Sequence, residues 1–230
     1  WLSHPLTYKS QADTDFVGGV TLVTHHLFTH QPWTNLQPGM TLGYWGLHFE
    51  RTQTWWHEIN AWNSYVQRSQ ALLSQGQPVF DVLHLLGDDS STKFDREFVY
   101  NTLPKGHDFE FISTHGLLNE LYVNNNKKLS FATGREYQIL SLADDISMRP
   151  QVLLKLKHLL EQGAVIVGKA PEFSPSLTDA EQADKQVQQL AKQIWGGQYN
   201  QQVFASLPEA FAKLNIEPDV RITGTDNRII

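Results

Sequence analysis

Residues 24–33 read Thr-His-His-Leu-Phe-Thr-His-Gln-Pro-Trp, and residues 49–56, beyond a loop rich in glycine, read Phe-Glu-Arg-Thr-Gln-Thr-Trp-Trp. Indole and imidazole rings carry polar edges that need hydrogen-bond partners when they are buried, so a dense run of them packs a core poorly. Beside glycine and proline, such a run is typical of a cleft for a polar, ring-shaped ligand. We therefore expect a strand to carry His26 and His30 to the rim of such a cleft.

That strand is predicted over residues 20–28, which are mostly β-branched or apolar. Alternate side chains of a strand share a face. One face would carry Thr24, His26, Phe28 and His30, and the other Val23, His25 and Leu27. A short partly polar stretch over residues 12–16 precedes the strand, and a long loop over residues 31–52 follows it. Because the loop carries Trp33 and Trp45, we expect it to be ordered and functional.

A helix is predicted over residues 54–75, with Thr54 as its N-cap and Gly76 beyond its end. Its apolar residues recur at three- and four-residue spacing, which is the period of an amphipathic helix. They are Trp55, Ile59, Trp62, Val66 and Leu73, with Leu72 alongside. This spacing places Trp62, and one of Trp55 and Trp56, in a core.

Strands alternate with helices from residue 79 onwards. The predicted strands cover residues 79–86, 108–112, 129–131, 137–142 and 164–167, and the predicted helices cover 114–121, 149–162, 178–194 and 207–214. The first strand is almost continuously apolar, as in a sheet buried on both faces. The pattern predicts an α/β fold with an open, mostly parallel sheet flanked by helices. We place the boundary between the two regions after residue 76, giving domains 1–76 and 77–230.

The composition excludes several classes of function. The chain of 230 residues is 40% hydrophobic, enough to bury a core, but no segment has the apolar length of a membrane span. The net charge is −6, and Lys127-Lys128 is the only basic doublet, so nucleic acid is excluded as a main partner. There is no cysteine, which removes disulfides, thiolate metal sites and cysteine nucleophiles. Because the chain begins with Trp1, we expect a fragment of a longer protein.

A metal site at His26 and His30 is not expected. Histidines four residues apart on one face of a strand lie about 13 Å apart at about 3.3 Å per residue, too far for one ion. Hydrogen bonding in a cleft, or a structural role, remain the two alternatives. Asp88-Asp89, at the end of a strand, could bind a ligand or a metal, but a solvated turn is the favoured interpretation.

Trp33 and Trp45 are candidates to stack on a sugar, because aromatic faces suit the apolar face of a pyranose; core packing is the alternative. Glu50 and Glu58 could supply one of the paired carboxylates of a glycosidase. A solvated ion pair between Glu50 and Arg51 is the favoured interpretation. Arg51 could contact a substrate, or anchor the loop through Glu or backbone carbonyls.

Several motifs carry a family likeness. They are His26-x-x-x-His30-Gln31-Pro32-Trp33, Pro38-Gly39-Met40-Thr41, Phe49-x-Arg51-Thr52-x-Thr54-Trp55-Trp56, Ala61-Trp62, Leu103-Pro104-x-Gly106-x-Asp108, Gly163-Ala164-x-x-x-Gly168 and Ser174-Pro175-Ser176-Leu177. Together they resemble the α-L-rhamnosidases of glycoside hydrolase family 106. The tryptophan-rich part is the specific one, since the trimerisation domain of family 42 β-galactosidases has a layout similar to the second region.

The resemblance implies an inverting hydrolase of terminal α-L-rhamnosides in rhamnose-containing glycans, with calcium assisting the full-length enzyme and a periplasmic or extracellular location. Residues 1–76 would hold the last strand and helix of a (β/α)8 barrel, and residues 77–230 a flavodoxin-like or glutamine-amidotransferase-like support domain. The substrate-binding residues would be His26, His30, Trp33, Trp45 and Arg51, with no metal ligand in this segment. His30 and Trp33 would lie at the rim where barrel active sites are found.

The same resemblance implies that two catalytic glutamates precede the chain, so that the 230 residues alone would be inactive. Two rival functions stay open. One is a β-galactosidase-type glycoside hydrolase, and the other is a non-catalytic sugar-binding or structural module. The sequence leaves the oligomeric state undetermined.

Overall fold

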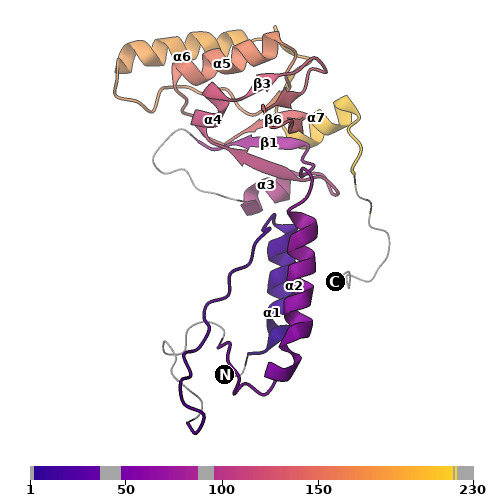
Figure 1. Cartoon of the computed structure of the whole chain (residues 1–230). Coiled ribbons are helices and arrows are strands. Elements are labelled where there is room, and N and C mark those ends of the chain that lie inside the picture. Colours follow the sequence, from indigo (N-terminus) through magenta and orange to yellow (C-terminus); the bar gives the residue numbers. More distant parts are fainter. Residues whose placement is uncertain (1–2, 37–47, 88–95, 220, 222–230) are drawn as a thin grey trace. The chain divides into compact units, whose positions relative to one another are not determined.

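The computed structural model describes residues 3–36, 48–87, 96–219 and 221 (Figure 1). The chain divides into two compact units, the first ending at Gln77 and the second beginning at Pro78. Each unit has its own hydrophobic core, so each is described separately.

Two helices are the main regular elements in the described part of the first unit. Helix α1 spans Pro5–Val17 and helix α2 spans Ile59–Leu73, preceded by the single 3-10 turn η1 over Trp56–Glu58. Helix α1 is longer than the predicted stretch over residues 12–16, because Pro5 suits a first helical turn. The core of the unit is small and consists of Ala12, Phe16, Phe49, Ile59, Trp62 and Val66.

The strand predicted over residues 20–28 is not formed. Residues 20–27 carry no strand pairing, and the pairing of this segment among the described residues is one isolated parallel bridge, Phe28 to Phe49. The prediction is wrong because apolar composition favours an extended backbone, whereas a strand also needs a neighbour along its whole length. The predicted alternation of faces is nevertheless confirmed, since burial alternates between exposed and half-buried from Leu22 to Phe28.

Helix α2 begins later than predicted. The expected N-cap, Thr54, precedes η1, and the residue before α2 is Glu58, whose side chain makes no capping hydrogen bond. The predicted apolar stripe is confirmed in its first half, where Ile59, Trp62 and Val66 are buried. It is wrong at the C-terminal end, where Leu72 and Leu73 are exposed.

A five-stranded parallel sheet organises the second unit, in the order β2-β1-β6-β7-β8. Its strands are β1 (Val82–Leu85), β2 (Phe109–Ile112), β6 (Ile139–Leu142), β7 (Ile166–Val167) and β8 (Val203–Phe204). Every pairing within it is parallel. The predicted parallel α/β sheet is therefore confirmed. Strand β8 was not predicted, because two residues are too few to show a strand pattern.

The second unit also has a second sheet of three short antiparallel strands. It consists of β3 (Tyr122–Val123), β4 (Leu129–Ser130) and β5 (Glu136–Tyr137). The strand predicted over residues 137–142 is thus two strands, because Gln138 separates β5 from β6 and its backbone N–H donates to Asp81 at 2.8 Å.

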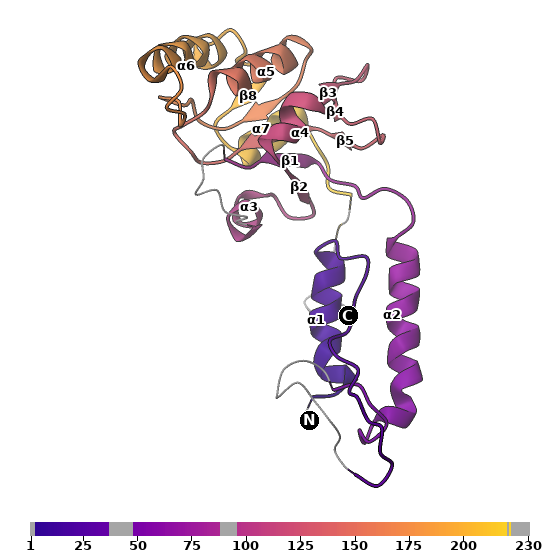
Figure 2. The ribbon, with the colours of Figure 1, turned by 60° about the vertical axis from the view of Figure 1, so that its left-hand side comes forward.

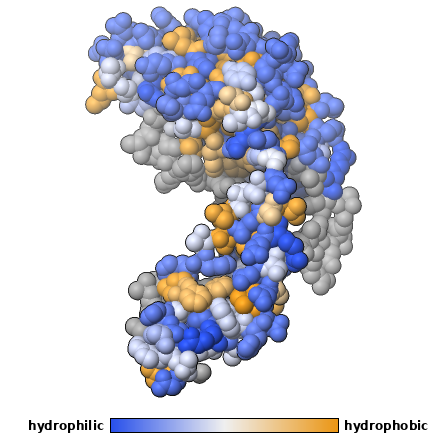
Figure 3. Space-filling view, in the orientation of Figure 1, coloured by the Kyte–Doolittle hydropathy of each residue, from blue (hydrophilic) through white to orange (hydrophobic). Residues whose placement is uncertain are grey.

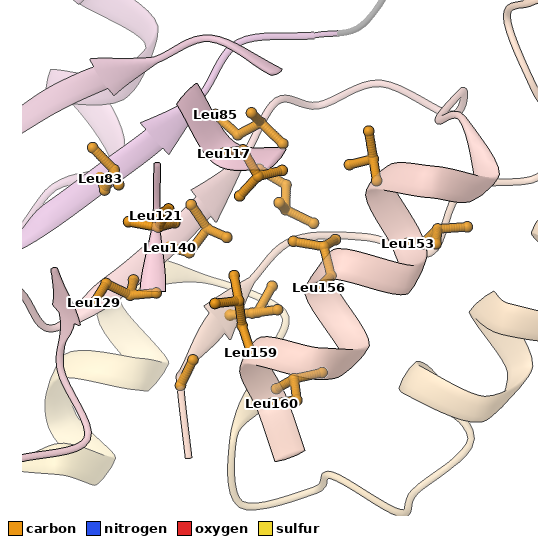
Figure 4. Packing of buried hydrophobic residues seen from close by; sticks show 14 of the residues in the cluster. Leu83, Leu85, Leu117, Leu121, Leu129, Leu140, Leu153, Leu156, Leu159 and Leu160 are labelled. Carbon is orange, nitrogen blue, oxygen red and sulfur yellow. The ribbon is translucent and has the colours of Figure 1, made fainter. Parts of the chain in front are cut away.

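Helices cover both faces of the five-stranded sheet (Figure 2). They are α3 (Arg96–Thr102), α4 (Thr114–Asn119), α5 (Pro150–Glu161), α6 (Ala180–Trp195) and α7 (Leu207–Leu214). Residues of α4, α5 and α6 share one core cluster with the sheet, and residues of α3 and α7 share the other. The first cluster is built largely of leucines from β1, β6, α4 and α5, which interdigitate in Figure 4.

Candidate functional site

The histidine-rich segment is held against residues 48–53 by backbone hydrogen bonds. Thr29 N–H donates to the carbonyl of Phe49 at 2.8 Å, and Phe49 N–H donates to the carbonyl of Leu27 at 3.1 Å. Because Thr29 is fully buried, this bridge is shielded from water. The two sequence motifs that suggested a site therefore lie side by side.

The two faces of the histidine-rich segment differ in burial. His26 and His30 are exposed, as is the ring of Phe28. His25, on the opposite face, stacks on Phe49 with ring centroids 4.6 Å apart and lies 6.1 Å from Trp62. Burial lowers the pKa of His25, so this imidazole is neutral near pH 7 and acts as part of the core. Of the histidines in this stretch, His26 and His30 are the ones that a ligand could reach.

Arg51 anchors the loop that carries Trp33. Its guanidinium donates to the carbonyl of Gln31 at 2.9 Å and to the carbonyl of Trp33 at 2.8 Å. The planar, forked geometry of a guanidinium suits two acceptors that lie near one another. This is the anchoring alternative weighed from the sequence, and it leaves substrate contact by Arg51 as a prediction.

Glu50 does not form the solvated ion pair expected from the sequence. Only 1% of its surface is exposed, and its carboxylate accepts the backbone N–H of Thr52 at 2.8 Å and the hydroxyl of Thr52. The expectation is wrong because the carboxylate of Glu50 accepts hydrogen bonds from Thr52, two residues later, and is buried instead of meeting Arg51 in solvent. Glu58, the other candidate carboxylate, is exposed.

Three polar residues near the exposed histidines in the sequence or on the paired segment are buried, and the sequence interpretation missed them. Thr29, Gln31 and His48 are all at least nine-tenths buried. The amide nitrogen of Gln31 donates to the carbonyl of Leu36 at 2.8 Å, but its Oε1 and the hydroxyl of Thr29 have no partner among the described residues. Unsatisfied buried polar atoms are uncommon. The signal that could have located them is the run of polar residues at 29–31 within an otherwise apolar pattern.

Of the predicted sugar-contact residues that the structure describes, only Arg51 and Trp33 are shown in contact. Trp33 is 48% exposed and is tied through Arg51 to the same backbone as Gln31. Trp45, together with Asp88 and Asp89, lies outside the described residues. A cavity of about 710 Å3 in this unit has a different lining, which includes Lys9, Trp55, Glu58, Trp62 and Tyr65. None of His26, His30 and Trp33 lines this cavity, and all three side chains are exposed.

Within the described part of the chain, no group of three or more His, Asp or Glu residues is placed to hold a metal ion. In the same residues, no helix has both the length and the apolar character needed to cross a bilayer. Figure 3 shows polar and apolar side chains interspersed on the displayed face.

Comparison with known proteins identifies the family. A family profile described as alpha-L-rhamnosidase, glycoside hydrolase 106, matches residues 1–230. A protein of Formosa agariphila, provisionally named a β-glucuronidase, is 34% identical over 197 residues, which cover 85% of this chain and 16% of that protein. The solved structure of a rhamnosidase from Novosphingobium sp. PP1Y is 27% identical, with a TM-score of 0.84 over 99% of this chain and 22% of that one. The chain thus spans about a fifth of the length of these relatives.

Proposed function

Because this chain belongs to the α-L-rhamnosidase family of glycoside hydrolases, family 106, we propose that it is part of an enzyme that hydrolyses terminal α-L-rhamnosides with inversion. The match over all 230 residues carries the proposal. It is supported by the exposure of His26, His30 and Trp33, which offer imidazole hydrogen-bonding groups and an aromatic face to a ligand. A sugar ring needs both kinds of contact.

We assign distinct roles to these exposed residues. The indole of Trp33 would stack on the apolar face of the rhamnose ring, and His26 and His30 would hydrogen-bond to its hydroxyls. Trp45 would add a second aromatic contact. Arg51 would act through Trp33, since its guanidinium donates to the backbone carbonyls of Gln31 and Trp33.

Inversion needs a carboxylic acid that protonates the leaving oxygen and a carboxylate that activates water on the opposite face of the sugar. In our proposal the remainder of the longer enzyme supplies this pair, because Glu50 is buried and hydrogen-bonded to Thr52. Calcium would polarise or orient sugar hydroxyls and would take oxygen ligands from the same remainder. The task of this chain is to bind and orient the sugar.

The finer fold assignment is also a proposal. The first unit would contribute the last strand and helix of a (β/α)8 barrel, in which residues 20–28 gain the neighbours that a strand requires. The second unit would be an amidotransferase-like support domain. Its strand order, with β1 between β2 and β6, supports a flavodoxin-like arrangement.

The test is hydrolysis of an aryl α-L-rhamnoside by the full-length parent and by its Trp33→Ala variant. We expect the variant to lose about tenfold or more in kcat/KM, which corresponds to about 1.4 kcal/mol of lost binding. Phe173→Ala is the matched control, because Phe173 is an exposed aromatic residue of the second unit. Absence of rhamnoside hydrolysis by the parent would refute the proposal, and the 230 residues alone should show none.

A second candidate is hydrolysis of a different glycoside, favoured by the likeness to a protein provisionally named a β-glucuronidase. A panel of aryl α-L-rhamnoside, β-D-glucuronide and β-D-galactoside offered to the parent separates these specificities. Sugar binding without hydrolysis of any of them would instead support the non-catalytic module.

A further inference from the structure

A pocket of about 530 Å3 opens in the second unit, beside the β2 side of the five-stranded sheet. Its lining comes from four places, which are β1 and β2, the end of α4, strand β3, and the β4–β5 turn. The lining includes Leu83, Glu110, Glu120, Tyr122, Arg135 and Tyr137. Figure 2 shows β3, β4 and β5 next to α4. The proposed reaction site lies in the other unit.

The base of the pocket combines an apolar residue with a polar network. Leu83 of β1 is the register partner of Glu110 of β2, so the two side chains share a face of the sheet. The hydroxyl of Tyr137, a residue that is 2% exposed, donates to the carboxylate of Glu110. Burial and this hydrogen bond raise the pKa of Tyr137, so the phenol remains a donor. Arg135 donates to the other oxygen of Glu110 at 2.6 Å.

This network is only partly withdrawn from water. The side chains of Arg135 and Glu110 are 37% and 30% exposed, respectively. An ion pair at this level of exposure contributes little to stability. The pair nevertheless presents a fixed carboxylate and a fixed guanidinium at the base of a concave site, and these are groups that can hydrogen-bond to adjacent hydroxyls.

Aromatic rings also line the pocket. Tyr122 is 45% exposed, and its hydroxyl lies 3.5 Å from the carbonyl oxygen of Phe131, to which it donates. Phe131 packs edge-on against Tyr137, with centroids 5.9 Å apart and ring planes at 87°. The accessible aromatic surface of the pocket is therefore held in place. Asn119 and Thr133 add polar groups at the rim.

The charges of the lining select the class of ligand. The lining contains two carboxylates, of Glu110 and Glu120, and one guanidinium, of Arg135. Phosphates and uronic acids would be repelled by this net negative lining, whereas a neutral polyol would not be repelled. Aromatic surface combined with a few converging polar groups is the general pattern of small-molecule sites.

We propose that this pocket binds a neutral sugar residue of a glycan, at a site separate from the proposed site of hydrolysis. The ring would lie on Tyr122, and its hydroxyls would bond to Glu110 and Arg135. The inference shares with the proposed function the premise that glycans are ligands, but it assigns no part of the reaction to the pocket. Such a site would hold the polymer near the enzyme and increase effective substrate concentration.

The test is a titration of the 230-residue chain with methyl α-L-rhamnoside and with neutral methyl glycosides of galactose, glucose and xylose, monitored by amide NMR shifts. We expect saturable shifts at pocket residues for at least one neutral sugar, and at least tenfold weaker binding in Tyr122→Ala. Glu110→Gln should weaken binding without loss of fold. Phe173→Ala is again the control and should leave the affinity unchanged.

Methyl β-D-glucuronide is the charged comparison and should bind more weakly than the best neutral sugar. Absence of saturable shifts with every neutral sugar, or an unchanged affinity in Tyr122→Ala, would overturn the inference. Trp33→Ala, which tests the proposed function, should not alter shifts at the pocket. A parent enzyme without rhamnosidase activity whose pocket still binds a neutral sugar would refute the proposed function alone.

Discussion

Replacement of Arg51 by lysine tests whether the loop carrying Trp33 is held by a two-pronged anchor. The guanidinium reaches the carbonyls of Gln31 and Trp33 at 2.9 and 2.8 Å. A lysine keeps the positive charge but is a point donor on a flexible stem, so it satisfies one carbonyl well and not both. Arg51→Lys therefore removes geometry while it retains charge.

The expected magnitude follows from the loss of one bond. A hydrogen bond from a charged donor contributes about 1.5–3 kcal/mol. Arg51 is an exposed residue, which places this loss at the lower end or below, at about 1–2 kcal/mol. Only the loop opens, so the cost falls on local rather than global unfolding. Protection of nearby amides should then decrease by roughly 5–30-fold.

Native-state hydrogen exchange measures this opening at two amides. Thr29 and Phe49 donate the backbone bonds that join the loop segments, and both residues are buried. The amide of Leu140, in β6 of the second unit, should exchange at the same rate in both proteins. Arg68→Lys is the matched control variant, since Arg68 is exposed on α2 and its exchange profile should match the wild type. Equal protection of Thr29 and Phe49 in Arg51→Lys would refute the anchor.

Two further predictions concern the second unit. His84 is buried against Ser141, 3.1 Å away, and burial lowers its pKa to about 4. As the pH falls, the His84 imidazole is protonated in the unfolded chain before it is protonated in the folded one. The free energy of unfolding should therefore decrease by about 3 kcal/mol between about pH 6.5 and about pH 4, and His84→Gln should flatten that part of a urea-denaturation series. Gly168 has φ 153°, and an added Cβ would lie 2.7 Å from the Cβ of Leu142. Gly168→Ala should therefore cost about 1–3 kcal/mol in the same assay.

The second unit could be predicted from the sequence in most of its elements. Continuous apolar residues in β1 and the 3.6-residue period of α5 are strong local signals, and the structure buries all of β1 and the apolar stripe of α5. Strand β8, at two residues, is too short to show a period. The division of residues 137–142 between two sheets depends on a hydrogen bond from the backbone N–H of Gln138 to the carbonyl of Asp81. No local sequence pattern predicts this long-range contact.

The first unit was predicted less well, and the reason is pairing. Residues 22–28 show the expected alternation of burial. Among the described residues, however, their backbone pairing is limited to one bridge, between Phe28 and Phe49. A side-chain pattern reports which face is covered, whereas a strand also requires a backbone neighbour. The same distinction explains Glu50, whose type suggested catalysis or an ion pair while its burial and its bonds to Thr52 determine its role.

Arg51 and Trp33 are coupled in a way that kinetics can separate. If Arg51 contacts the sugar directly, Arg51→Lys and Trp33→Ala should lower kcat/KM independently, and their effects should add. If Arg51 acts by holding the carbonyl of Trp33, 2.8 Å away, loss of the indole leaves little for the anchor to position. The double variant of the full-length parent should then resemble Trp33→Ala alone, with an interaction energy of about 0.5–3 kcal/mol. Full additivity in an aryl α-L-rhamnoside assay would contradict the anchoring role and assign Arg51 to the substrate.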